Sequence, residues 1–144
     1  MTVTGDALVI DVKFEDIRKF LIEKNFFKAN ENVELCIFAA SIGLQHKNFI
    51  ETEKRGFVAG WDVGPITANK GKANFFGLKY TKNKDVLSDE KKCWEIVSSY
   101  AKGGFEWLEE RRKDVSGHPE DFATLILNEM RSITSDLATP VTQD

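Results

Sequence analysis

Residues 33–44, VELCIFAASIGL, form the longest nearly uncharged segment of the chain, and Glu34 is their only charged residue. They lie within a longer stretch, residues 31–54, whose ends are polar and charged. On a helix, the apolar side chains of this segment would point almost all the way round, and such a helix must be covered on most sides. The segment therefore predicts a mainly α fold, with a compact helical domain around a buried central helix.

The length and composition limit the domain organisation. A chain of 144 residues is the size of one ordinary domain and can bury a core without disulfides or a structural metal. Its 42% hydrophobic and 30% charged residues are typical of a soluble globular protein. We expect a single helical domain over residues 1–137, with a small irregular or β-containing insert at about residues 56–84 and a flexible tail over residues 138–144.

Apolar spacing predicts three further helices, over residues 14–27, from Ser88 to about Lys113, and from Pro119 to about Leu137. Ser88 is the expected N-cap residue of the second of these, and Pro119 suits the first position of the last.

The central helix is expected to begin at an N-cap provided by Asn30 or Asn32. We expect it to end near Gly43, because glycine readily adopts the left-handed conformation at a helix C-terminus. Gly103 and Gly104 lie inside the long helical pattern that ends near Lys113, where each costs about 1 kcal/mol relative to alanine. Either they allow close packing against the central helix, or they kink or end their own helix.

The region between the central helix and the helix predicted from Ser88 is rich in turn-forming residues. Residues 56–66 contain three glycines and Pro65 but lack the spacing of a phosphate-binding loop, so we expect short extended segments and turns. Residues 69–74 are expected to form a polar turn, and residues 75–80 either a strand or one helical turn. Near the N-terminus, the β-branched run at residues 7–12 predicts a strand or an extended arm.

The same region is the most basic part of a chain whose formal net charge is −3. Lysines interleaved with aromatic residues can bind single strands or phosphate backbones, whereas the acidic chain argues against a dedicated nucleic-acid-binding protein. The alternative is a solvated loop that covers aromatic core residues. A nucleic-acid site here would use Lys70, Lys72, Lys79 and Lys82, with Trp61, Phe75, Phe76 and Tyr80 as the interleaved aromatic residues.

No catalytic, metal-binding or cofactor-binding motif stands out. GxSxG, HExxH and Walker A patterns are absent, and His46 and His118 are too few for a self-contained zinc site. Asp62, beside Trp61, is the one acidic residue in an apolar setting. It is either an acid with a perturbed pKa or a turn aspartate that bonds the local backbone. We expect a protein that is not an enzyme and that binds no cofactor or metal.

Cysteine usage and the N-terminal sequence bear on the cellular location. Cys36 and Cys93 lie in apolar helical patterns and form no CxxC pair, as expected for buried thiols in a reducing compartment. Residues 1–6 lack the basic region of a secretory signal, and no run approaches the roughly 18 apolar residues that span a bilayer. These features predict a cytoplasmic protein without a membrane contact.

Two segments resemble a bacterial family. Residues 36–47, CIFAASIGLQHK, resemble a FAAxLGxxHxxR-like signature in small proteins encoded beside DNA phosphorothioation (Dnd) gene clusters. Residues 96–108, IVSSYAKGGFEWL, are similar to the EEYANGGLxxL segment of the same proteins. The matching positions are Phe38, Ala39, Gly43, His46, Tyr100, Gly103 and Gly104.

The chain also departs from this family's pattern. Gly64, Pro65 and Ile66 match only part of a GEPI turn, Ser99 replaces an acidic residue, and the helix from Pro119 onward is an addition. The resemblance implies an accessory component of a bacterial antiviral defence system against foreign DNA, and it identifies no reaction.

These observations lead to one expected function and one alternative. We expect a non-enzymatic accessory or regulatory subunit that acts through protein–protein contacts, either with a larger protein of the same defence system or with another copy of itself as a homo-oligomer. The alternative is a DNA-binding accessory protein that uses the basic and aromatic region at residues 70–92.

Overall fold

The computed structural model describes residues 14–51, 70–114 and 119–138. Within these ranges the chain is helical, contains no strand, and so confirms the predicted mainly α class. The elements are α1 (Glu15–Glu23), α2 (Asn32–Gln45), α3 (Lys70–Thr81), the 3-10 helix η4 (Lys84–Ser88), α4 (Glu90–Asp114) and α5 (Pro119–Ala138).

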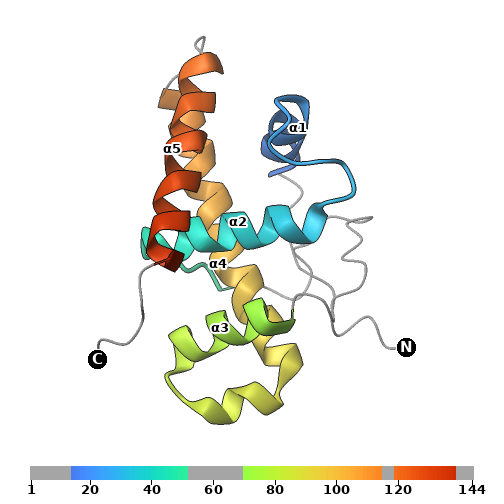
Figure 1. Cartoon of the computed structure of the whole chain (residues 1–144), viewed down its shortest axis with the longest axis vertical. Helices are drawn as coiled ribbons and strands as arrows, with labels where there is room; N and C mark the ends of the chain where they lie inside the picture. The colour runs from blue at the N-terminus through green and yellow to red at the C-terminus, as the bar shows by residue number, and fades with distance from the viewer. Residues whose placement is uncertain (1–13, 52–69, 115–118, 139–144) are drawn as a thin grey trace.

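Helix α4, not α2, is the centre of the fold. Its 25 residues give it a length of roughly 37 Å, enough to reach every other element. Helix α2 crosses it near its middle, α3 and η4 lie against its N-terminal half, and α5 runs beside its C-terminal half (Figure 1). Residues 33–44 do lie in a largely buried helix, as expected. They are not the central element of the fold, because that element is α4.

Glycines allow α2 and α4 to cross with their backbones in contact. A Cβ atom on Gly104 would overlap the carbonyl oxygen of Ala39, and one on Gly43 would overlap the carbonyl oxygen of Tyr100. A Cβ atom on Gly103 would overlap the carbonyl oxygen of Asn48. Close packing is thus the compensation for both glycines, against α2 for Gly104 and against the segment that follows α2 for Gly103, and α4 continues through both without ending.

Helix α2 ends near Gly43, as expected, but Gly43 is buried inside the helix and does not supply the expected left-handed residue. The helix continues to Gln45, and Lys47 takes the left-handed conformation with a φ of 55°. The amide of Asn48 donates to the carbonyl oxygen of Gly43 at 2.7 Å, and that of Lys47 donates to Leu44 at 3.2 Å. These bonds form a Schellman motif. Gly43 is therefore required for the close contact between α2 and α4, and it does not provide the left-handed residue at the end of α2.

The segment after α2 is fastened to α4. The side-chain amide of Asn48 donates to the carbonyl oxygen of Gly103 at 2.9 Å. The backbone amide of Ile50 donates to the carbonyl oxygen of Ser99 at 3.2 Å. Because Gly103 has no side chain, the backbone at Asn48 can lie directly on the surface of α4.

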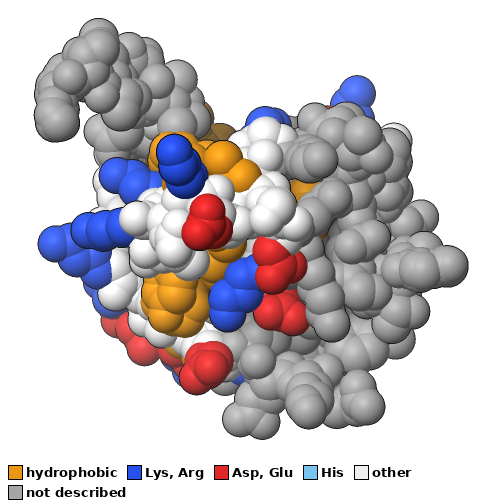
Figure 2. Space-filling view, turned by 90° about the horizontal axis from the view of Figure 1, so that it is seen from below, with side chains coloured by type: hydrophobic (Ala, Val, Ile, Leu, Met, Phe, Trp, Pro, Cys, Tyr) orange, Lys and Arg blue, Asp and Glu red, His pale blue; other side chains and the backbone are white. Residues whose placement is uncertain are grey.

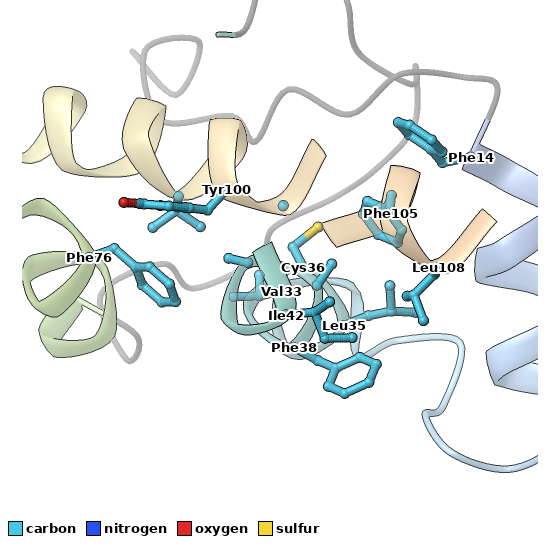
Figure 3. Packing of buried hydrophobic residues seen from close by; sticks show 14 of the residues in the cluster. Phe14, Val33, Leu35, Cys36, Phe38, Ile42, Phe76, Tyr100, Phe105 and Leu108 are labelled. Atoms are coloured by element: carbon cyan, nitrogen blue, oxygen red, sulfur yellow. The ribbon is translucent and has the colours of Figure 1, made fainter. Parts of the chain in front are cut away.

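The core lies around this crossing and extends toward α1 and α3. Phe14 stacks on Phe105 with the ring centroids 5.4 Å apart, and Phe76 extends from α3 toward α2 and α4 (Figure 3). The cluster draws on every described helix. Its largest fully buried side chains are Trp94, Phe14, Phe105, Phe122, Ile17, Leu21, Leu35, Ile42, Leu108 and Ile126.

Both expected N-cap assignments were wrong by one residue. Helix α2 follows Glu31, so neither Asn30 nor Asn32 is its N-cap residue. At the start of α4, Oδ1 of Asp89 accepts a hydrogen bond from the amide of Lys92 at 3.1 Å, while Ser88 is the last residue of η4. The short 3-10 helix occupies Ser88 and moves the start of α4 to the next residue.

The described part of the expected insert is also helical. Residues 70–74, expected to form a turn, and residues 75–80, expected to form a strand or one helical turn, all belong to α3. Residues 7–12 and 56–69 lie outside the described residues, as do residues 139–144 of the expected tail. Residue 138, expected in that tail, is the last residue of α5.

Candidate interaction surface

The positions that carry the family resemblance meet at the crossing of α2 and α4. Six of the seven are buried, namely Phe38, Ala39, Gly43, Tyr100, Gly103 and Gly104. Gly43, Gly104 and the backbones of Ala39 and Tyr100 form the contact between α2 and α4, Gly103 lies against Asn48, and Phe38 packs on Phe27. The structure therefore gives these six residues a packing role.

His46, the seventh position, contacts both α4 and α5. Its ring stacks on Trp107 with centroids 4.1 Å apart, and its Nε2 lies 3.1 Å from Oε1 of Glu129. Beside it, the side-chain amide of Gln45 donates to the hydroxyl oxygen of Ser132 at 2.8 Å. These contacts hold α5 against the C-terminal end of α2.

Helix α3 has a buried side and an exposed side. Ala73, Phe76 and Gly77 face the core, and a Cβ atom on Gly77 would lie 2.6 Å from the sulfur of Cys93. Positions 72, 75 and 79 recur at the spacing that places residues on one helix face. On that face Phe75 is 39% exposed, and Leu78 beside it is 38% exposed.

The exposed side of α3 is also basic. Lys72, Lys79 and Lys82 are exposed, and Lys82 follows the helix with a φ of 56°. Lys70 is the first residue of the helix, and its side chain is not among those described. Residues 70–84 contain five lysines and no acidic residue, so the rest of the chain carries −3 − 5 = −8. Figure 2 shows this end of the molecule, where hydrophobic side chains reach the surface beside Lys and Arg.

An apolar pocket lies between α2, α3 and α5, next to this exposed face. Its volume is about 560 Å³. Phe75 belongs both to the pocket wall and to the exposed face of α3. The lining residues are Phe27, Glu34, Ile37, Phe38, Ser41, Gly71, Lys72, Phe75, Phe76, Met130 and Ile133.

Aromatic stacking fixes α3 to the rest of the molecule. Tyr80 stacks on Phe49 with centroids 4.3 Å apart, and Phe49 meets Tyr100 edge-on at 4.9 Å. Phe75 and Phe76 also meet edge-on, at 5.5 Å. Such pairs contribute about 0.5–1.5 kcal/mol each beyond the area they bury. The contacts of Tyr80 with Phe49 and of Phe49 with Tyr100 therefore hold the C-terminal end of α3, a helix that supplies part of the pocket lining, against the segment after α2 and against α4.

Burial is the main cause of the raised pKa values of Cys36 and Tyr100. Burial raises the pKa of the Cys36 thiol well above its ordinary value of 9.0, against a weaker opposing effect of Arg18. Burial, with a smaller effect of Tyr80, raises the pKa of Tyr100 above 10.0. Both groups stay protonated and neutral at pH 7, so neither is activated as a nucleophile.

Other chemistry has little support within residues 14–51, 70–114 and 119–138. No group of three or more His, Cys, Asp and Glu side chains there is arranged to hold a metal ion. No helix in these ranges is both long and apolar enough to cross a membrane. Asp62 lies outside them.

No protein-family model, curated protein or solved structure matches this chain. The resemblance to proteins encoded beside phosphorothioation genes stays a prediction.

The pocket was not foreseen from the sequence, because its lining comes from segments up to about a hundred residues apart. One signal was available: the spacing of Lys72, Phe75 and Lys79 is that of an exposed helix face. The structure brings Lys72 and Lys79 onto that face and places Lys82 just beyond it.

Proposed function

We propose that this chain is a non-enzymatic, cytoplasmic accessory subunit of a bacterial defence system against foreign DNA and acts through contacts with a larger protein of that system. The observation that carries the proposal is the apolar pocket at the surface, with the exposed Phe75 and Leu78 beside it. Contiguous exposed apolar surface is typical of an interaction site, whereas single exposed apolar residues need no explanation. The resemblance of residues 36–47 and 96–108 supplies the biological setting.

The proposal is tested by affinity purification of the tagged chain from its native host, with mass spectrometry of nuclease-treated and untreated samples. A defence protein that co-purifies in both samples supports the proposal. Recovery of additional copies of this chain alone would instead indicate a homo-oligomer. Recovery of neither, under conditions that preserve other complexes, would contradict a role through protein contacts.

A DNA-binding accessory protein is the second candidate, and a specific observation favours it. Lys72 and Lys79 share one exposed face with Phe75, and Lys82 follows, in a segment without acidic residues. Such a surface can contact phosphates through lysine and bases through the aromatic ring.

Titration with a labelled oligonucleotide at several salt concentrations tests this candidate. Replacing Lys72, Lys79 and Lys82 with Gln should weaken binding and reduce the slope of log K against log salt by about 2–3. Replacing the exposed Lys19, Lys28 and Lys113 with Gln makes the same change in charge elsewhere and serves as the control. Undetectable binding, or equal effects of the two triple variants, would exclude this surface as a DNA site.

A further inference from the structure

We infer that the pocket between α2, α3 and α5 receives the apolar side chains of an amphipathic, acidic helix from the partner protein. The inference rests on the proposed function and makes it more specific, because it names the binding site and the chemistry of the bound segment.

The lining determines what kind of group fills the pocket. Seven of its eleven residues are apolar or aromatic, and they come from α2, α3, α5 and the segment before α2: Phe27, Ile37, Phe38, Phe75, Phe76, Met130 and Ile133. A volume of about 560 Å³ lies within the range of pockets that bind a ligand through apolar contacts. The occupant therefore presents several apolar side chains together.

The mostly apolar lining favours a helix over an extended peptide. The hydroxyl of Ser41 donates to the carbonyl oxygen of Ile37 at 2.9 Å, within its own helix. An extended peptide usually gains affinity by adding a strand to a sheet edge, and the described residues include no strand. A helix satisfies its own backbone groups and presents apolar side chains at intervals of three and four residues.

Charge complementarity indicates that the bound helix carries acidic residues. Lys72 lies in the pocket wall, Lys79 continues along the same face of α3, and Lys82 follows. Acidic residues beside the apolar stripe of the bound helix would face these lysines, while Glu34, also in the lining, disfavours a uniformly acidic segment. DNA matches the lysines but carries no aliphatic side chains for the pocket, so the whole arrangement fits a protein helix better.

Site-specific photo-crosslinking in the native host tests the inference. The photoreactive amino acid p-benzoylphenylalanine replaces Phe75 in the full chain, and crosslinked peptides are identified by mass spectrometry. The control carries it in place of Leu127, which is 40% exposed on α5 and is not part of the pocket lining.

The expected result is a crosslink from position 75, and not from position 127, to a partner segment with helical apolar spacing and acidic flanks. Crosslinks only to DNA, only to this chain, or to a segment without that pattern would overturn the inference. Absence of any crosslink at position 75 from a complex that co-purifies would overturn it as well.

Two variants separate failure of this inference from failure of the proposed function. Phe75→Glu puts a charge in the pocket wall, and Lys72→Glu reverses the charge beside it; circular dichroism verifies that both fold. Each should reduce the co-purified partner roughly tenfold or more, whereas Leu127→Ala should not. A partner retained by all three variants overturns the pocket assignment but leaves the proposed function standing. If the unmodified chain has no partner, both fail.

Discussion

Three glycines determine how closely α4 approaches α2 and the segment that follows it. At Gly43, Gly103 and Gly104 the missing side chain is replaced by a carbonyl oxygen of another segment. Their cost in helix propensity is therefore offset by tertiary contact. The sequence indicated that Gly103 and Gly104 needed compensation, but only the structure shows which atoms supply it.

Replacing Gly104 with alanine should lower the free energy of unfolding by about 1–3 kcal/mol, although alanine is the better helix former. The added methyl group would overlap the backbone oxygen of Ala39, which cannot move without displacing α2. Gly71→Ala is the matched control, because no atom lies within 4 Å of its added Cβ, and it should stabilise the protein by about 0.5–1 kcal/mol. Urea denaturation measures both, and a stabilising Gly104→Ala would contradict this account.

The raised pKa values of Cys36 and Tyr100 predict that the protein is less stable at alkaline pH. Both groups hold their protons more tightly in the folded chain than in the unfolded chain. The resulting stabilisation is complete below their ordinary values, 9.0 and 10.0, and is lost as the pH rises through the higher folded values.

The urea concentration at the unfolding midpoint should therefore decrease as the pH is raised from 9 to about 10.5. This decrease should be larger than any change between pH 7 and pH 9. The Cys36→Ala variant lacks one of the two groups, so it should lose less stability over the same alkaline range. Equal losses in the variant and the original chain would show that Cys36 does not contribute.

Among the elements, apolar spacing predicted α1, α4 and α5, and the continuous apolar segment predicted α2, but neither signal predicted α3. Gly71 and Asn74 are poor helix formers, which made residues 69–74 resemble a turn. Packing reverses this preference, because Ala73, Phe76 and Gly77 are buried against the core. Local propensity is weak compared with the burial of a large aromatic side chain.

The start of α4 gives a test that separates two neighbouring residues. Asp89→Ala removes the acceptor for the amide of Lys92 and should lower the free energy of unfolding by about 1 kcal/mol. Ser88→Ala removes only an exposed hydrogen bond to the carbonyl oxygen of Asp85 and should change it by less than about 0.5 kcal/mol. Thermal denaturation of both variants measures the difference, and the reverse order would restore Ser88 as the cap.

In the whole molecule, the central position of α4 predicts cooperative unfolding. It contacts α1, α2, α3, η4 and α5, and its Phe105 is fully buried beneath Phe14. A protein organised in this way should lose its described helices together rather than one at a time.

Phe105→Ala should lower the free energy of unfolding by about 3–5 kcal/mol, because it leaves a cavity at the centre of the core. Hydrogen exchange should become faster in all the helices of the core, not only in α4. Leu127→Ala, at a 40% exposed position, should change stability by less than about 0.5 kcal/mol. Faster exchange confined to one helix after Phe105→Ala would show that the units unfold separately.

Local sequence features were enough to establish the helical class, the approximate limits of α2, α4 and α5, the burial of most of residues 33–44 and the need to compensate Gly103 and Gly104, whereas α1 ends at Glu23 and not at the predicted residue 27. Each of these follows from the spacing of apolar residues or from backbone freedom, which are local properties. The tertiary structure alone decided that α4 is the centre, that residues 70–81 are helical, and that Phe27, Ile37, Phe75 and Ile133 line one pocket. These depend on contacts between segments far apart in the chain, which periodicity does not encode.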